Sequence, residues 1–137
     1  MTAKEYLKQY ENIVRRIRIL DDRIQVLEEE ADMIKSVTDY DGMPHGSNIG
    51  HPTEDKAIRL VDEKLRRTDL RLAAQEQAEV ILDTILKVDG VEQEVLYLRY
   101  IKLMKWEEIA CAINYSWEQT HFYHRKALSI VESLITT

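Results

Sequence analysis

The sequence predicts an all-α protein, in which a long N-terminal antiparallel helical hairpin, coiled-coil-like, precedes a helix-turn-helix domain. Apolar residues near the N-terminus recur at alternating spacings of four and three over about four heptads, a pattern typical of coiled-coil helices. A second helical stretch of similar length follows a segment rich in glycine and proline. Residues 91–137 then hold two helical patterns separated by a short turn. We therefore assign 1–88 to the hairpin and 91–137 to the helix-turn-helix domain.

The first helix of the hairpin is expected at about residues 3–35. Its apolar seam comprises Tyr6, Tyr10, Ile13, Ile17, Leu20, Ile24, Leu27, Ala31 and Ile34. A second, weaker stripe of Ile19, Val26 and Met33 recurs every seven residues on another face. Two apolar faces imply two packing partners, so we expect the hairpin to join copies of the chain, most simply as a homodimer, or to dock RNA polymerase.

The loop of the hairpin is expected at 36–53, which holds three of the four glycines and both prolines. Thr53 precedes two acidic residues, which favour a helix N-terminus, so the second helix is expected at about 54–88. Its inward residues are predicted to be Ile58, Val61, Leu65 and Leu72, then Ala74, Ala78, Ile81, Ile85 and Val88. The two sets are out of phase near Leu72, which predicts a stutter. Gly90 marks the end of this helix.

The helix-turn-helix pattern begins near Trp106, with Ile109, Ala110 and Ile113 on one face of a short helix. Asn114 stands where the turn needs a left-handed backbone, which asparagine tolerates better than other non-glycine residues. Ser116 and Gln119 have the spacing of a capping box at the start of a second helix, residues 117–130. Thr120, Tyr123, Ala127 and Leu128 are expected to face inward, and Cys111 to be a small buried filler.

Composition excludes several classes of protein. The chain has 137 residues and a net charge of −6, with no apolar run as long as a membrane span and no signal-peptide core. The single cysteine fits a reducing compartment, so we expect a cytoplasmic protein of a bacterial host cell, without membrane contact. No phosphate-binding loop or nucleophile elbow is present, so neither an enzyme, a cofactor nor a small-molecule substrate is expected. His121 and His124 have a chelating spacing but no third ligand nearby in sequence, so no metal site is predicted.

Several segments resemble a known group of proteins. Glu94–Tyr100, Trp106–Ser116 and Arg125–Leu128 look like region 4 of bacterial sigma factors, which reads the −35 promoter element. Nearly the whole chain resembles phage and prophage transcriptional regulators of the RinA/ArpU type. The further matching segments are Lys4–Leu7, Asp41–Pro44 with His45 and Gly46, Glu54–Glu63 and Tyr115–Leu128. The resemblance implies a regulator, expected to be an activator, that reads promoter DNA of phage or prophage genes with helix 117–130.

The partner implied by this resemblance is double-stranded DNA, with one helix in the major groove. Residues carried over to base contacts are Trp117, Glu118, Gln119, His121, Phe122 and Arg125. The phosphate contacts are expected from Lys102, Lys105, Ser116, His124 and Lys126. Arg125 could donate two hydrogen bonds to guanine, and Glu118 could accept one from cytosine. For each of the two residues, the alternative is an ordinary solvated charge.

The charge of the domain leaves other functions open. Residues 91–137 carry five basic residues against six acidic ones, a net charge of about −1, whereas affinity for DNA comes largely from neutralising phosphates. Dimerisation would offset this weakness by presenting two reading helices. One alternative is an interaction protein that does not bind DNA but contacts RNA polymerase or a sigma factor. Another is a DNA-packaging subunit, since such subunits also join a helix-turn-helix to an oligomerising helical segment.

Overall fold

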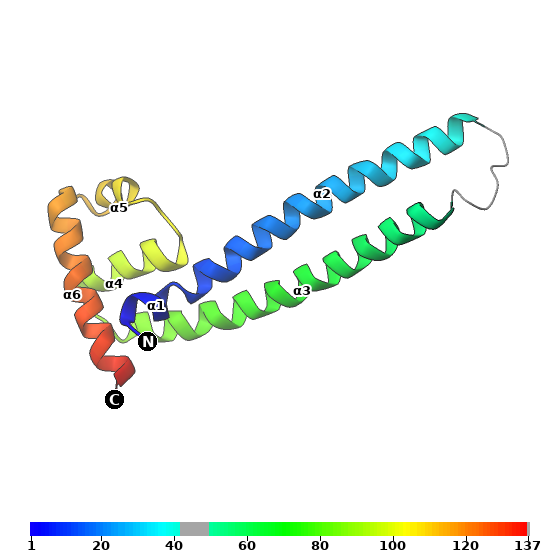
Figure 1. Ribbon diagram of the computed structural model, residues 1–137. Helices are drawn as coiled ribbons and strands as arrows, with labels where there is room; N and C mark the ends of the chain where they lie inside the picture. Colours follow the sequence, from blue (N-terminus) through cyan, green and yellow to red (C-terminus); the bar gives the residue numbers. More distant parts are fainter. Residues whose placement is uncertain (42–49, 137) are drawn as a thin grey trace. The chain divides into compact units, whose positions relative to one another are not determined.

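A computed structural model describes the backbone of residues 1–41 and 50–136 and the side chains of 1–32 and 54–136, and this part of the chain is all-helical. Its elements are α1 (Ala3–Leu7), α2 (Gln9–Asp41), α3 (Gly50–Leu86), α4 (Gly90–Leu96), the π-helical turn η2 (Tyr97–Ile101), α5 (Trp106–Ile113) and α6 (Trp117–Thr136). Figure 1 shows these elements, and the chain divides into two compact units. Residues 15–72 make one unit, and residues 1–14 with 73–137 make the other. The second unit therefore contains residues from both sides of residue 88, where the sequence predicts the boundary between the hairpin and the helix-turn-helix domain.

The unit of residues 15–72 is an antiparallel pair formed by α2 and α3. Asp21 Oδ1 lies 2.9 Å from Arg67 Nη1, and Glu30 Oε2 lies 3.4 Å from Lys56 Nζ. Because the partner's number falls along α3 as the number rises along α2, the two helices run in opposite directions. These pairs are partly exposed, so each adds little to the free energy of unfolding, although together they fix the register.

The predicted seam of α2 is buried where it faces α3, with Leu20, Ile24 and Leu27 each less than a tenth exposed. The predicted second stripe is exposed at Ile19 and Val26, while the side chain of Met33 lies outside the described residues. The α2 seam is therefore confirmed over its described central part. Among the described residues of this unit, nothing covers the stripe at Ile19 and Val26.

The predicted inward face of α3 is wrong over its first half. Four residues expected to be inward are 56–60% exposed, namely Ile58, Val61, Leu65 and Leu72. The face toward α2 instead holds Glu63 and Arg67, which bond to Arg23 and Asp21 across the pair. Because these charged side chains occupy positions of the α3 face that packs on α2, a prediction from the spacing of apolar residues chooses the opposite, exposed face. Burial continues at spacings of three and four from Leu60 to Ile81, so no stutter is needed.

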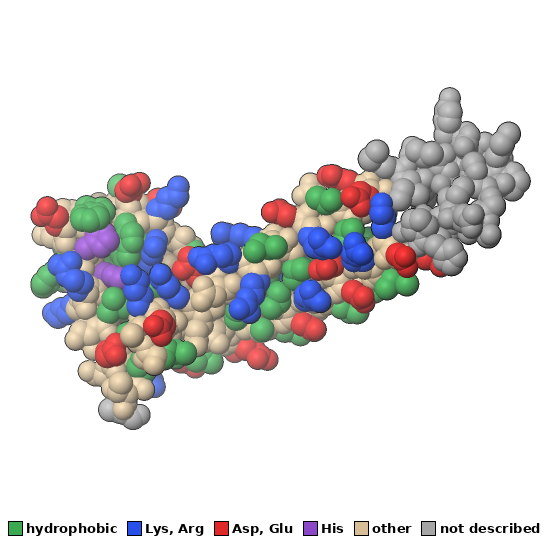
Figure 2. All heavy atoms as spheres, in the orientation of Figure 1, with side chains coloured by type: hydrophobic (Ala, Val, Ile, Leu, Met, Phe, Trp, Pro, Cys, Tyr) green, Lys and Arg blue, Asp and Glu red, His purple; other side chains and the backbone are tan. Residues whose placement is uncertain are grey.

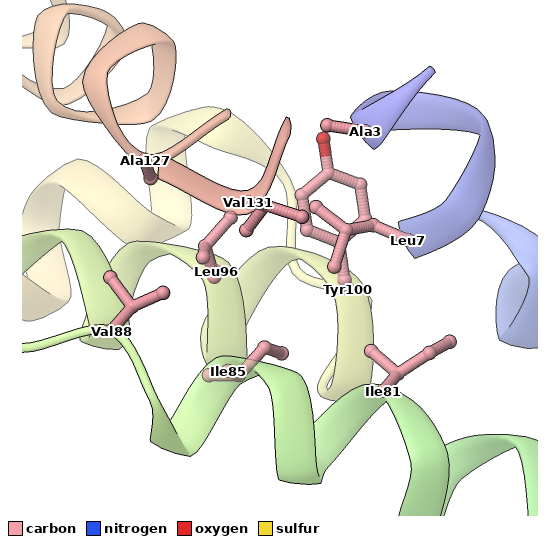
Figure 3. Close-up of a cluster of buried hydrophobic side chains, with 9 residues drawn as sticks. All are labelled: Ala3, Leu7, Ile81, Ile85, Val88, Leu96, Tyr100, Ala127 and Val131. Atoms are coloured by element: carbon pink, nitrogen blue, oxygen red, sulfur yellow. The ribbon is translucent and has the colours of Figure 1, made fainter. Parts of the chain in front are cut away.

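The other unit encloses the main hydrophobic cluster (Figure 3). Side chains from α1, α3, α4, η2, α6 and the segment between α3 and α4 converge there, namely Ala3, Leu7, Ile81, Ile85, Val88, Leu96, Tyr100, Ala127 and Val131. The predicted burial of Ile81, Ile85 and Val88 is confirmed. Burying each valine, leucine or isoleucine of this cluster contributes roughly 1.5–3 kcal/mol, which makes the cluster the chief support of the unit.

Helix boundaries depart from the sequence expectation at four places. The single helix expected at 3–35 is divided at Lys8, because α1 packs on α6 and the Ala3 N–H donates to Glu132 Oε2 at 3.0 Å. The loop expected at 36–53 is too wide, since residues 36–41 and 50–53 are helical. Pro52 is tolerated in the first turn of α3, where backbone N–H groups have no helical acceptor.

The two remaining differences concern helix ends. The second long helix ends at Leu86 rather than Val88, two residues earlier than expected. Helix α6 runs past the expected residue 130 to Thr136, because Val131 and Leu134 pack on the main cluster. The motif at Asp41–Pro44, with His45 and Gly46, extends beyond the described residues. Across the described ranges, no helix is both long and apolar enough to cross a membrane.

Candidate nucleic-acid interface

A tight turn joins α5 to α6. Asn114 has φ 59° and ψ 38°, in the left-handed region, and its N–H donates to the carbonyls of Ala110 and Cys111. The N–H of Tyr115 then donates to the Ala110 carbonyl at 3.2 Å. These bonds satisfy carbonyls that the end of α5 would otherwise leave free. The predicted left-handed position at Asn114 is confirmed.

Reciprocal capping fixes the start of α6. The Gln119 N–H donates to Ser116 Oγ at 3.1 Å, and the Ser116 N–H donates to Gln119 Oε1 at 3.1 Å. This is the capping box that the sequence predicts. Thr120 is buried and donates its hydroxyl to the Ser116 carbonyl at 2.8 Å. The Thr120 N–H also donates to the Ser116 carbonyl at 2.9 Å, so four hydrogen bonds that start or end at Ser116 hold the first turn of α6.

Beyond this cap, the first two turns of α6 expose most of the predicted base-contacting residues. Trp117 is 57% exposed and Phe122 is 54% exposed, as the sequence predicts for two large aromatics on this face. Glu118 and Arg125 are also exposed. Adjacent turns of one helix thus present two aromatic rings, one acid and one guanidinium.

Four of the five predicted phosphate contacts are exposed. Lys102 and Lys105 are exposed on the segment between η2 and α5. Lys126 is exposed on α6, but its Nζ lies 3.3 Å from Glu92 Oε1, so an internal partner competes for its charge. Ser116 is exposed, and its side chain is engaged in the helix cap.

His124 is the fifth expected phosphate contact, and the expectation that it faces outward is wrong. It is only 6% exposed, and its Nε2 lies 2.7 Å from the hydroxyl of Tyr100. Its place is one turn after Thr120 and three residues before Ala127, which are both fully buried. The inward stripe of α6 therefore includes His124, and helical periodicity of apolar residues alone did not reveal it because a histidine scores as polar.

A chain of five rings connects the surface of α6 to the core. Trp117 and His121 have ring centroids 4.0 Å apart, and His121 and Trp106 have centroids 4.4 Å apart. Trp106 meets His124 at 4.5 Å, and His124 stacks on Tyr100 at 5.8 Å. The exposed ring of Trp117 is thus backed by a packed series of aromatic contacts. Such support holds a surface side chain in one position at low entropic cost on binding.

Arg99 belongs to this site, although sequence reasoning did not select it. Its guanidinium carbon lies 4.7 Å from the centroid of the Trp106 ring, and its Nη1 donates to the Met104 carbonyl at 2.9 Å. The chain can fold back here because Leu103 adopts a left-handed conformation with φ 57°. A bulky residue at positive φ is uncommon, so no local sequence signal predicts this reversal.

Positive charge gathers around the histidines. Burial lowers the pKa of His124 to about 4, with further lowering by His121, Lys4, Arg99 and Arg125. Burial, Arg125 and Arg99 also lower the pKa of His121. In Figure 2, Lys and Arg side chains lie on both sides of the histidine side chains on this face, with hydrophobic side chains between them. Although acidic residues outnumber basic ones in this unit, Lys4, Arg99 and Arg125 lie close enough to the histidines to lower their pKa values, a local concentration of charge that the net charge does not reveal.

Two further expectations concern Cys111 and metal binding. Cys111 is exposed rather than buried, because it lies on the solvent side of α5 opposite Ile109. The Nε2 of His121 is enclosed and has no hydrogen-bond partner among the described residues. Within the described ranges, no three His, Cys, Asp or Glu side chains lie together as a metal ion would need.

Searches of protein-family models, curated proteins and solved structures find no match to this chain. The chemistry of the site therefore follows from its own residues. Those residues offer a rigid, capped helix start with exposed aromatic, acidic and basic side chains, set beside exposed lysines.

Proposed function

We propose that the chain is a sequence-specific DNA-binding transcriptional regulator of phage or prophage genes, an activator of the RinA/ArpU type. In this proposal, α2 and α3 form a helical hairpin, and α4 to α6 form a sigma-region-4-like helix-turn-helix whose α6 enters the major groove. The main support is the turn between α5 and α6, where the left-handed Asn114 and the Ser116 capping box fix the start of an exposed helix.

Base recognition would come from the exposed N-terminal half of α6. Arg125 can donate a pair of hydrogen bonds to the O6 and N7 atoms of guanine, and Glu118 can accept from the amino group of cytosine. The apolar edges of Trp117 and Phe122 suit thymine methyl groups. His121 contributes by holding Trp117 at 4.0 Å rather than by charge, since its pKa is lowered.

Phosphate binding would come from Lys102 and Lys105, the exposed cations that precede α5. Arg99 adds charge from its place above Trp106. Because the pKa of His124 is about 4, this residue is neutral at pH 7 and cannot neutralise a phosphate. A single copy therefore makes few ionic contacts, so we expect weak, salt-sensitive binding unless two copies act together.

The proposal is tested by selecting binding sites from random-sequence duplex DNA with the full chain. Enrichment of one sequence, followed by preferential binding of that duplex over a scrambled duplex of the same composition, is the expected result. Recovery of unenriched sequence at low salt would contradict sequence-specific binding. Because the starting pool is random, the selection itself identifies the operator.

The exposed pair of aromatics favours a second candidate from a different class. Trp117 and Phe122 are each more than half exposed beside an acid, Glu118, and large exposed aromatics are common at protein interfaces. In this alternative, α6 contacts RNA polymerase or a sigma factor and does not bind DNA. Binding of purified polymerase that is lost in Phe122→Ala, with no DNA sequence enriched by the wild-type chain, would favour it.

A further inference from the structure

The outer face of α3 carries an exposed apolar stripe with the spacing of a coiled-coil seam. It consists of Ile58, Val61, Leu65 and Leu72, which we call the α3 stripe, with Thr68 completing the alternation of three and four. Each of the four apolar residues is at least 56% exposed. The Thr68 hydroxyl donates to the Lys64 carbonyl at 3.1 Å, so burial of this residue would leave no free donor.

The α3 stripe is distinct from the face that α3 turns toward α2. That inner face holds Glu63 and Arg67, which bond across the pair. Helix α3 therefore has two seams: one faces α2, and the other, the α3 stripe, is exposed. A contiguous exposed apolar row of this kind is typical of an interaction surface.

The two edges of the α3 stripe carry opposite charges. Asp62 and Asp69 lie on one edge, while Lys64 and Arg71 lie on the other. All four side chains are exposed. Within the α2–α3 pair, Lys64 Nζ also lies 2.9 Å from Glu28 Oε1, and Arg71 Nη2 lies 3.7 Å from Asp21 Oδ1. This asymmetry determines which arrangement of two identical helices is favourable.

Two copies of the stripe can meet about a two-fold axis in either of two directions. In a parallel pair, the acidic edge of each copy lies along the basic edge of the other, and Lys64 meets Asp69 of the second copy. In an antiparallel pair, acid lies along acid and base along base, because the same edges face each other. The charges therefore select the parallel arrangement.

We propose that the α3 stripe is the homodimer interface, at which two copies of α3 pair in parallel. Lys64 of each copy then bonds to Asp69 of the other, and the residues after Leu72 leave both copies at the same end of the pair. This deepens the proposed function and rests on it, because a dimer carries two reading helices, one for each of two half-sites. The pairing itself is measured without DNA.

The interface is tested by sedimentation of the full chain, comparing wild type, Leu65→Glu and the matched control Val26→Glu on α2. The wild type and Val26→Glu are expected to sediment as dimers, and Leu65→Glu as a monomer with unchanged helical circular dichroism. A monomeric wild type, or a Leu65→Glu variant that remains dimeric, overturns the proposal. A dimer lost only in Val26→Glu places the interface on α2 and also overturns it.

Direction is tested by disulfide formation in a Cys111→Ser background, because Cys111 is itself exposed. Parallel pairing brings Ile58 beside Ile58 of the second copy, so Ile58→Cys alone should form a covalent dimer. A covalent dimer that forms only when Ile58→Cys is mixed with Leu72→Cys shows antiparallel pairing and contradicts the proposal. If covalent dimers form but selection enriches no DNA sequence, the pairing stands and the DNA-binding function fails.

Discussion

The hydroxyl of Tyr100 and Nε2 of His124 lie 2.7 Å apart inside the main core, and this bond joins η2 to α6. Both groups are neutral at pH 7, because burial raises the pKa of Tyr100 to about 12 and lowers that of His124 to about 4. A buried neutral pair of this kind costs little desolvation, yet leaves an unsatisfied polar atom if one partner is removed. The bond lies on the buried side of α6, opposite the exposed face, and so helps to fix the position of this helix.

Replacing Tyr100 by phenylalanine should therefore destabilise the fold. The ring would be retained, while His124 Nε2 would lose its partner, and we expect the free energy of unfolding to fall by about 1–3 kcal/mol. Denaturant unfolding monitored by circular dichroism measures this change. Tyr97→Phe, a partly buried tyrosine on the same turn, is the matched control. An effect no larger than that of the control would show that the bond contributes nothing.

Acid should destabilise the protein through His124. Its pKa is about 4 in the folded chain against an ordinary value of 6.5, so the unfolded chain takes up a proton first as pH falls. The contribution of neutral His124 to the free energy of unfolding is therefore fully present above pH 6.5. It is lost as pH falls toward 4, and the total loss is about 3 kcal/mol. Unfolding curves at pH 7, 5.5 and 4.5 measure this loss. His124→Gln, which can still bond to Tyr100, should show a shallower dependence, and an unchanged dependence would contradict this assignment.

The left-handed turn at Asn114 should discriminate between small substituents. Asn114→Gly is expected to be nearly neutral, because glycine adopts φ 59° without a steric penalty. Asn114→Ala is expected to cost about 1 kcal/mol, since a Cβ disfavours this region for most residues. Thermal unfolding of the two variants gives the comparison, and equal midpoints would argue against strain at this turn.

The lysines between η2 and α5 should act on DNA through phosphate alone. Lys102→Ala and Lys105→Ala are each expected to weaken binding to selected and scrambled duplexes equally. Each should also reduce the slope of log affinity against log salt by about 1. Anisotropy titrations at several salt concentrations measure both quantities. Lys87→Ala, an exposed lysine outside the α5–α6 region, should leave the slope unchanged; a change of slope there would mean that the contacts are not local.

Local rules predicted the turn well, because the information lies in adjacent residues. Asn114 tolerates a left-handed backbone, and the spacing of Ser116 and Gln119 defines a capping box, so neither depends on distant packing. The inner face of α3 could not be found in the same way. Glu63 and Arg67 occupy seam positions because partners on α2 neutralise them, and those partners are at least 40 residues away in sequence.

In the α6 site, the sequence predicted which aromatic side chains are exposed but not which polar side chains are buried. Exposure of Trp117 and Phe122 follows from helical periodicity, whereas burial of His124 requires Tyr100 as a partner. Arg99 joins the site through the reversed backbone at Leu103, a conformation that its own residue type disfavours. Sequence periodicity therefore indicates which residues point outward, while long-range pairing decides which polar residues are enclosed.

The central claim, that α6 reads base sequence, is tested most directly by the affinity of Arg125→Ala for the selected duplex and for its scrambled form. Arg18→Ala, an exposed arginine on α2, is the matched control for loss of one positive charge. We expect Arg125→Ala to lose on the order of 10- to 100-fold in affinity for the selected duplex, with a much smaller loss for the scrambled one. Arg18→Ala should preserve the discrimination of the wild type. Equal losses on both duplexes, or equal effects of the two variants, would contradict sequence reading by α6.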